Sequence, residues 1–297
     1  MEDLFKYEVA RVKRRGFWLV PGFFSLSIYF IYLPFIIKPL LSFLISRVSE
    51  DVVQIAAIVI VHHSSYIVHC CLLSLLAVLK IQVFERYRVG VEWPYDLFGR
   101  AMKTMALNFC VIVPVVEYLF VWFGVLRCRV DEEWPDLCES VYNVLVCVVC
   151  EDIWSYVGHR IMHTGSFYRR YHKKHHEYRA SIGYSAEYAH PVEYIGVNVM
   201  ATGFGPLLLG QRMHFLTFLV WISYRIGDTI DQHGGYDFPW TPFAILPFSS
   251  NFYLADSTYH DFHHTRNNGN YSSQFVILDY LCGTVGKKKG SKETKAS

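Results

Sequence analysis

Three histidine clusters in the second half of this 297-residue chain have the spacing of metal ligands. They read His159-Arg-Ile-Met-His163, His172-Lys-Lys-His175-His176 and His260-Asp-Phe-His263-His264. Histidines three or four residues apart on a helix lie on one face, one turn apart, so two imidazoles can reach the same ion. One such pair is a weak signal, but three clusters in one stretch of sequence are rarely a coincidence. The clusters therefore predict a metal site.

The number of histidines indicates two ions rather than one. The three clusters hold eight histidines, whereas a single zinc ion takes about four ligands. His233, at the exit of an apolar segment, and His190, in Glu-Tyr-Ala-His-Pro, are two further candidate ligands. Imidazole suits iron, zinc, copper and nickel, so the ligand type alone leaves the metal open.

Polar residues near the clusters have two interpretations each. A ligating imidazole usually donates its second N–H to a carboxylate or carbonyl group, which fixes its orientation. Asp231 and Asp261 are the first candidates for this role behind the ligands, and ordinary surface charge is the alternative. His62, His63 and His69 lie inside an apolar run. They either bond to neighbouring helices or line a substrate path.

Long apolar segments must position these histidines. Apolar residues make up 53% of the chain and charged residues 18%, against roughly 25% charged residues in typical globular domains. A helix that crosses a bilayer needs about 20 apolar residues. The runs that approach this length are 17–37, 52–79, 106–126 and 141–157. A shorter, glycine-containing pair of runs, 195–209 and 213–226, predicts a re-entrant hairpin.

The charges between the runs predict an orientation. Basic residues precede the first run and recur through 80–103, whereas 127–139 is mostly acidic. Positively charged loops stay in the cytosol. After four crossings the histidine region is then cytosolic, as are the N-terminus and the lysine-rich C-terminus. The net charge of +2 gives no support for nucleic-acid binding, which needs a strong basic excess.

Together these features predict an all-α protein, a polytopic membrane helical bundle of about four spans plus a short hairpin, capped by a cytosolic histidine-rich di-metal domain. The expected parts are a cytosolic N-terminal segment (1–16), transmembrane helices (17–157), a histidine-box catalytic domain (158–284) with a membrane hairpin near 195–226, and a basic cytosolic tail (285–297). Cys128 and Cys138 flank the loop on the lumenal side, where disulfides persist. We hypothesise that they pair, with two free thiols as the alternative.

The histidine clusters in a multi-span apolar chain resemble the fatty acid hydroxylase superfamily of membrane di-iron oxygenases. Residues from about 154 to 284 resemble its C4-methylsterol monooxygenases. The motifs that carry this resemblance are His172-Lys-Lys-His175-His176-Glu177-Tyr178, Ala186-Glu-Tyr-Ala-His190-Pro191, Asp231-Gln-His233-Gly-Gly-Tyr236-Asp-Phe-Pro239 and the third histidine cluster. The Ala-Glu-Tyr-Ala-His-Pro stretch favours the methylsterol branch, whereas Gly235 to Trp240 is similar to the cholesterol 25-hydroxylase branch as well.

The resemblance implies a multi-pass enzyme of the endoplasmic reticulum membrane with two iron ions at a cytosolic site, where zinc can replace iron in purified protein. It also implies the use of O2, electrons from NAD(P)H through cytochrome b5 and its reductase, and oxidation of the C4 methyl group of a sterol. Carried over residue by residue, the implied metal ligands are His159, His163, His172, His175, His176, His190, His233, His260, His263 and His264.

Aromatic residues near the clusters are candidates for the wall of a lipid pocket, with core packing as the alternative. They are Tyr184, Tyr188, Tyr236, Trp240 and Phe262. Two other functions stay open. One is a hydroxylase or desaturase of the same superfamily acting on another lipid, such as a sterol side chain. The other, of a different class, is a membrane metal-binding or carrier protein.

Overall fold

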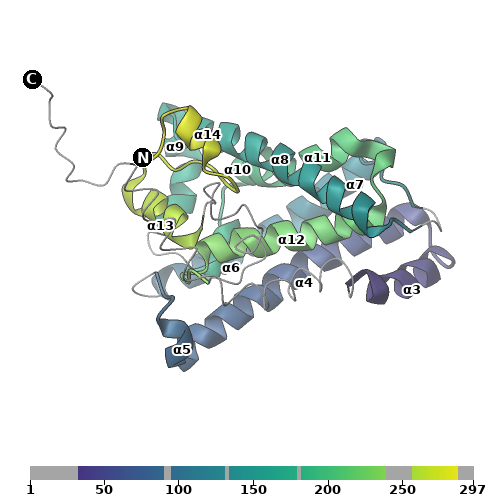
Figure 1. Ribbon diagram of the computed structural model, residues 1–297, viewed down its shortest axis with the longest axis horizontal. Coiled ribbons are helices and arrows are strands. Elements are labelled where there is room, and N and C mark those ends of the chain that lie inside the picture. Colours follow the sequence, from purple (N-terminus) through teal and green to yellow (C-terminus); the bar gives the residue numbers. More distant parts are fainter. Residues whose placement is uncertain (1–32, 90–94, 131–133, 179–181, 239–255, 287–297) are drawn as a thin grey trace, which may run out of the picture.

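The computed structural model describes residues 33–89, 95–130, 134–178, 182–238 and 256–286. Within these ranges every regular element is a helix, and the long helices run along one axis of an elongated bundle (Figure 1). The predicted all-α membrane bundle is therefore confirmed, with an approximate number of spans.

Three helices of the described residues are long and apolar enough to cross a membrane. The first is α4 (Glu50–Leu79), whose acidic residues are confined to its first turn and which ends at Lys80 in the left-handed conformation. Its 30 residues extend about 45 Å, more than the roughly 30 Å of a bilayer core. Many of its outward side chains, Ile60 and Leu72 among them, are apolar and exposed, as lipid contact requires.

The other two candidate spans are helices joined end to end through π-helical turns. The second consists of α6 (Tyr95–Leu107), η3 (Asn108–Ile112) and α7 (Val113–Trp122). Pro114 lies at the start of α7 and has no N–H to donate, which accounts for the wider turn of η3 directly before it. The third consists of α10 (Pro191–Glu193), η6 (Tyr194–Val199), α11 (Met200–Leu209) and the 3-10 turn η7 (Gly210–Arg212).

Two further long helices lie inside the bundle or along it without meeting the composition of a span. The fourth predicted run lies in α8 (Leu137–Met162), which contains the buried acids Glu151 and Asp152. The second arm of the predicted hairpin is α12 (Phe215–His233), which is buried along most of its length and packs against α4. The hairpin is thus one candidate span followed by a central core helix. The first predicted run, 17–37, lies mostly outside the described residues, and its last part begins α3 (Leu33–Ile45).

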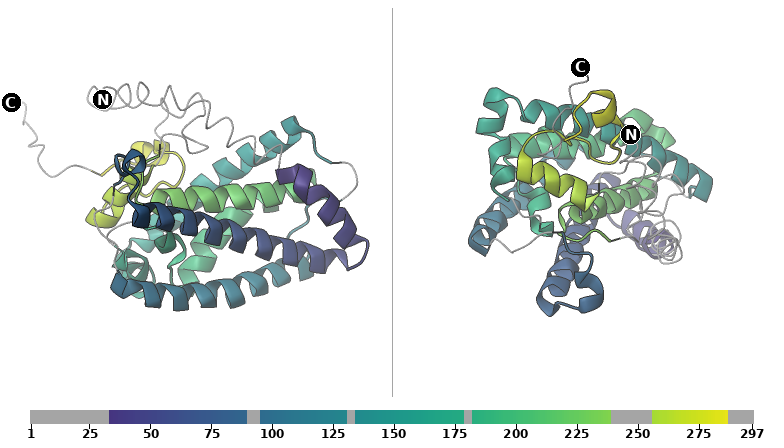
Figure 2. Two further views of the ribbon diagram at one scale, coloured as in Figure 1. Left: turned by 90° about the horizontal axis from the view of Figure 1, so that it is seen from below. Right: turned by 60° about the vertical axis from the view of Figure 1, so that its left-hand side comes forward.

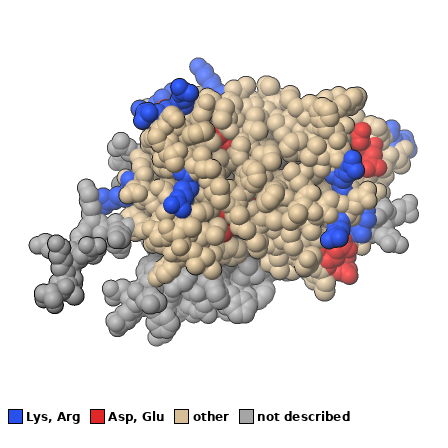
Figure 3. Space-filling view, turned by 90° about the horizontal axis from the view of Figure 1, so that it is seen from above, with Lys and Arg blue, Asp and Glu red and all other residues tan. Residues whose placement is uncertain are grey.

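Charged side chains gather toward the two ends of the bundle. On the face shown in Figure 3, a broad surface nearly free of charge separates them, as expected for a membrane protein. At one end, the segment after α5 (Gln82–Glu85) bonds to the chain just beyond α12, with the N–H of Val89 2.8 Å from the carbonyl oxygen of Gly235. The basic loop and the histidine-bearing helix ends therefore lie on the same side, as the charge pattern predicts (Figure 2).

The opposite end of the bundle carries the loop in which we hypothesised a disulfide. Both cysteines are free thiols, Cys128 buried and Cys138 exposed, so the structure contradicts the predicted pairing. The N–H of Arg129 donates to the carbonyl of Met213 at 2.8 Å, which fixes Cys128 against the start of α12. Cys138 instead lies in the first turn of α8, whose N-cap residue is Asp136.

The remaining short helices collect at the histidine end of the bundle (Figure 1). They are α9 (Gly165–Arg170), η4 (His172–Glu177), η5 (Gly183–Glu187), α13 (Ser257–Arg266) and α14 (Ile277–Leu281).

Candidate metal centre

Nine histidines come together in two groups, and within each group the nitrogens lie within 4.8 Å of one another. The five-histidine group contains His159, His163, His172, His176 and His263. The four-histidine group contains His175, His233, His260 and His264. Nine of the ten histidines selected from the sequence are therefore neighbours in space.

Helical spacing explains how the two groups share their elements. On α13, His260 and His264 are four residues apart and face one group, while His263 faces the other. On η4, His172 and His176 likewise face the five-histidine group, while His175 faces the four-histidine group. Each of these short helices thus presents imidazoles to both groups, so the two candidate metal positions must be adjacent.

The Nε2 atoms within each group are as close as ligands of one ion would be. In the five-histidine group, Nε2 of His163 lies 2.9 Å from that of His172 and 3.1 Å from that of His263. In the four-histidine group, Nε2 of His260 lies 2.9 Å from that of His233 and 3.0 Å from that of His264. Nitrogens about 2.0–2.1 Å from a common ion are separated by roughly 3 Å.

The hydrogen-bond partners of the outer nitrogens, Nδ1, determine which nitrogen of each ring carries the hydrogen. Nδ1 of His263 donates to the carbonyl of Gly269 at 2.7 Å, and Nδ1 of His264 donates to the carbonyl of Tyr178 at 2.9 Å. Further Nδ1 atoms that face carbonyl oxygens belong to His159, His175 and His233. A neutral imidazole with hydrogen on Nδ1 has only a lone pair on Nε2. The Nε2 lone pairs of these rings therefore point toward one another with no hydrogen between them. Such an arrangement needs a cation.

Burial keeps the rings neutral and so available as ligands. Desolvation lowers the pKa of His172 to about 3 and that of His175 to about 4. It also lowers the pKa values of His263 and His264 well below the ordinary 6.5. Neutral imidazole is the form that binds metal, so the donor set fits two nitrogen-ligated ions.

Two buried acids that the sequence interpretation did not select support the rings. Glu193 accepts a hydrogen bond of 2.7 Å from Nδ1 of His172, and both side chains are buried. Asp279 accepts from the N–H groups of Tyr271 and Ser272 at 3.0 and 2.8 Å. It thereby positions the loop whose carbonyls meet the outer nitrogens. Asp279 has no histidine at helical spacing, and the histidine three residues before Glu193, His190, is not its partner. Only a conflict between charge and predicted burial could therefore have indicated these acids.

Three predicted residues have other surroundings or stay untested. The ring of His190 lies outside both groups. Its Nδ1 accepts from the N–H of Val192 at the start of α10, so the geometry does not support it as a ligand. Asp231 lies 2.8 Å from Nε2 of His69 on α4, and thus supports a ring outside the groups. Asp261 is partly buried on α13, and its role behind the ligands stays a prediction.

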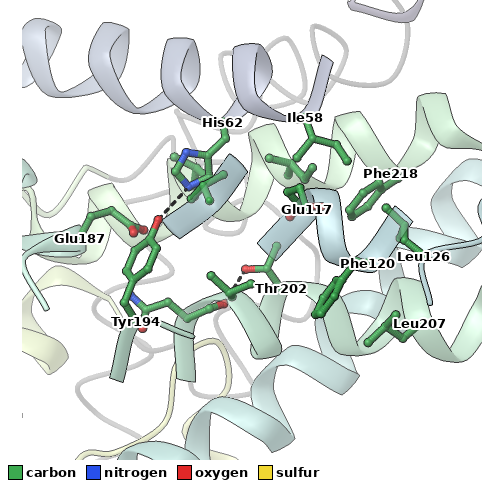
Figure 4. A pocket seen from close by; sticks show the side chains of 16 residues that line it. Ile58, His62, Glu117, Phe120, Leu126, Glu187, Tyr194, Thr202, Leu207 and Phe218 are labelled. Carbon is green, nitrogen blue, oxygen red and sulfur yellow. Dashed lines mark hydrogen bonds between the residues drawn. The ribbon is translucent and has the colours of Figure 1, made fainter. Parts of the chain in front are cut away.

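A largely apolar cavity lies inside the bundle (Figure 4). It adjoins the space among the histidines, since Asn198 lines both. Its walls come from α4, α7, η6, α11 and α12, and include Ile58, Phe120, Leu126, Leu207 and Phe218.

The aromatic residues expected around the pocket are not on the wall of this cavity. Tyr188 donates to Glu177 at 2.9 Å, and Tyr236 donates to Glu85 at 3.0 Å. Tyr184 packs against Tyr66, and Phe262 lies beneath the guanidinium of Arg266. Trp240 lies outside the described residues. The role of these residues at a lipid pocket stays a prediction. Nearness in sequence to the clusters does not bring them to this cavity, which is built by the spans.

Comparison with known proteins gives consistent results. Residues 144–284 match the fatty acid hydroxylase family. A Dictyostelium discoideum protein provisionally named as a methylsterol monooxygenase is 32% identical over 228 residues, which cover 77% of this chain and 80% of that protein. A methylsterol monooxygenase of Aspergillus fumigatus is 41% identical over 158 residues, covering 51% and 50%. A very-long-chain aldehyde decarbonylase of Oryza sativa subsp. japonica is 36% identical over 210 residues, covering 69% and 76%. No solved structure matches the chain.

Proposed function

The chain belongs to the fatty acid hydroxylase family, and from this premise we propose that it is a membrane di-iron monooxygenase that oxidises the C4 methyl group of 4-methylsterols. The observation that carries the proposal is the convergence of nine histidines, seven of them buried, into two adjacent groups. The relatives named as methylsterol monooxygenases support the sterol as substrate. The apolar cavity beside the two histidine groups further supports the proposal.

The two histidine groups would each hold one iron ion. Bound iron would supply the activation of O2, because no protein side chain can oxidise a methyl C–H bond. The chain's own contribution is to keep the imidazoles neutral and to orient them through carbonyl oxygens and Glu193. It also provides a largely apolar cavity in which the lipid would bind.

The membrane arrangement fits a lipid substrate and an aqueous electron donor. We propose that the histidine end faces the cytosol at the endoplasmic reticulum, where cytochrome b5 and its reductase deliver electrons from NAD(P)H. Exposed basic residues such as Arg170 and Lys173 lie beside the histidines, and the basic loop near Arg88 lies at the same end. A sterol would enter the cavity from the bilayer, between the candidate spans.

Oxidation of 4,4-dimethylsterol by microsomes that contain the protein tests this proposal. With NADH and O2, we expect a 4-carboxysterol that depends on oxygen, and about two metal ions per chain in the purified protein. The His263→Ala variant should lose one ion and the product together, whereas His190→Ala should keep both ions. Absence of a 4-carboxysterol from active, metal-loaded protein would refute the C4 assignment.

A long-chain aldehyde is the second candidate substrate. Rice relatives named very-long-chain aldehyde decarbonylases match 69% to 73% of the chain at 36% and 34% identity. Incubation of the same microsomes with a very-long-chain aldehyde distinguishes the two reactions. Formation of a hydrocarbon in place of a 4-carboxysterol would assign the chain to this second reaction.

A further inference from the structure

Polar side chains of the cavity beside the histidine centre gather toward one end, with Glu117 and Thr202 between the two ends (Figure 4). His62, Glu187 and Tyr194 lie together on one side of it, and Phe120, Leu126 and Leu207 lie on the other (Figure 4). A cavity with this distribution suits an elongated lipid with a single polar group. The end at which the polar side chains lie therefore indicates how such a lipid is oriented.

The polar end is a connected network with unfilled positions. Nε2 of His62 lies 3.5 Å from the hydroxyl of Tyr194, and Tyr194 in turn hydrogen bonds to Glu187. Nδ1 of His62 and Oε2 of Glu187 are both shielded from solvent and have no hydrogen-bond partner in the protein. Buried polar atoms are nearly always paired. Two open atoms on one cavity wall therefore point to a ligand that pairs with them.

This polar end is the one nearest to the histidines. Asn198 of η6 lines both the apolar cavity and the separate cavity among the histidines. Successive residues of the chain line different cavities here: Glu193 faces the histidine cavity, and its neighbour Tyr194 faces the apolar one. A polar group bound at His62 and Glu187 would thus be next to the reacting end of the substrate.

We propose that His62 and Glu187 bind the hydroxyl group of the substrate and so place the carbon beside that hydroxyl at the metal centre. The inference rests on the proposed function and deepens it. In a sterol the only hydroxyl is on C3, directly beside C4, while the side chain is at the far end of the ring system. The arrangement therefore selects C4 methyl groups and disfavours oxidation of the side chain.

The hydrogen-bond chemistry specifies a donor on the substrate. When Tyr194 donates its single hydrogen to Glu187, Nε2 of His62 must donate to Tyr194, which leaves Nδ1 of His62 as an acceptor. A sterol hydroxyl can donate its single hydrogen to this nitrogen. Its oxygen can accept a hydrogen from the protonated carboxyl of Glu187, whose pKa burial raises to about 7. A 3-deoxysterol can do neither. A site built for a hydroxyl discriminates strongly against an analogue that lacks it, because its own buried groups are then left unpaired.

Equilibrium binding to the full chain in lipid nanodiscs tests the inference without turnover. The probes are 4,4-dimethylsterol and its 3-deoxy analogue, each radiolabelled. We expect the wild-type protein to bind the hydroxyl form at least about tenfold more tightly. In His62→Leu this preference should fall toward one, through weaker binding of the hydroxyl form alone. Glu187→Gln, which keeps the side-chain shape, should reduce the preference in part.

Two further variants separate the anchor from general packing. His63 is adjacent on α4, and its Nδ1 faces the carbonyl of Val59 at 2.6 Å, so His63→Leu should leave the preference unchanged. Glu117 lines the same cavity, with one carboxylate oxygen unpartnered. Glu117→Gln should also leave the preference unchanged, and loss of the preference in this variant would reverse the proposed orientation and overturn the inference.

The remaining outcomes are equally decisive. Equal affinity of the wild type for both sterols, binding of neither sterol, or an equal loss for both in His62→Leu would overturn the inference. The microsomal assay decides the proposed function separately. A retained hydroxyl preference without a 4-carboxysterol would support the anchor and refute the C4 reaction.

Discussion

The hydrogen bond between His172 and Glu193 predicts how much a buried acid behind the candidate ligands contributes to metal affinity. Nδ1 of His172 lies 2.7 Å from Glu193, and the two side chains are only 2% and 6% exposed. A hydrogen bond to a charged group contributes about 1.5–3 kcal/mol, and each 1.4 kcal/mol is about a tenfold change in affinity. Glu193→Gln should therefore weaken metal binding at the five-histidine group by about 10- to 100-fold, as is typical of residues behind metal ligands.

The assay is competition for metal between the purified protein and a chelator of known affinity, with the metal content per chain as readout. Asp231→Asn is the matched control, because Asp231 pairs with His69 outside both groups. The control should keep wild-type affinity, and the four-histidine group should stay filled in both variants. Unchanged affinity in Glu193→Gln together with a loss in Asp231→Asn would refute the structural assignment and restore the one made from sequence.

Three other perturbations have defined outcomes. His263→Ala should reduce the metal content from about two ions per chain to about one, whereas His190→Ala should not, as measured by elemental analysis. Burial lowers the pKa of His172 to about 3 and of His175 to about 4. The unfolded chain then binds more protons between about pH 3 and 6.5, so chelator-treated protein should lose stability as pH falls through this window. Thermal unfolding at successive pH values checks the sign. Gly205→Ala should lower stability by about 1–3 kcal/mol, because its Cβ would lie 2.6 Å from a backbone atom of α8. Thermal unfolding in detergent measures this loss.

The sequence predicts well which histidines come together in space, because helical spacing is a local property. His159 and His163, like His260 and His264, lie one turn apart whatever the rest of the chain does. His190 lies outside both groups because its neighbour Pro191 begins a helix, and the ring accepts an N–H of the first turn. Residues far apart in sequence, such as Glu193 and His172, have no spacing that shows their contact.

The apolar runs are likewise evident in the sequence, but their positions in the bundle are not. The 213–226 run is as apolar as a membrane arm, yet α12 is enclosed by other helices and packs against α4. Hydropathy reports a preference to leave water, and both lipid and a protein core satisfy it. Only the packing of the whole chain decides between them.

The sequence by itself determined the all-helical membrane class and identified the nine histidines that come together in space. Both depend on composition and on contacts within one or two helical turns. Only the tertiary structure decided which histidines share a group, which acids support them and where the cavity is polar. Those properties depend on contacts between distant segments, as between His62 on α4 and Tyr194 on η6. Periodicity carries no information about such contacts, since they arise when the helices pack together.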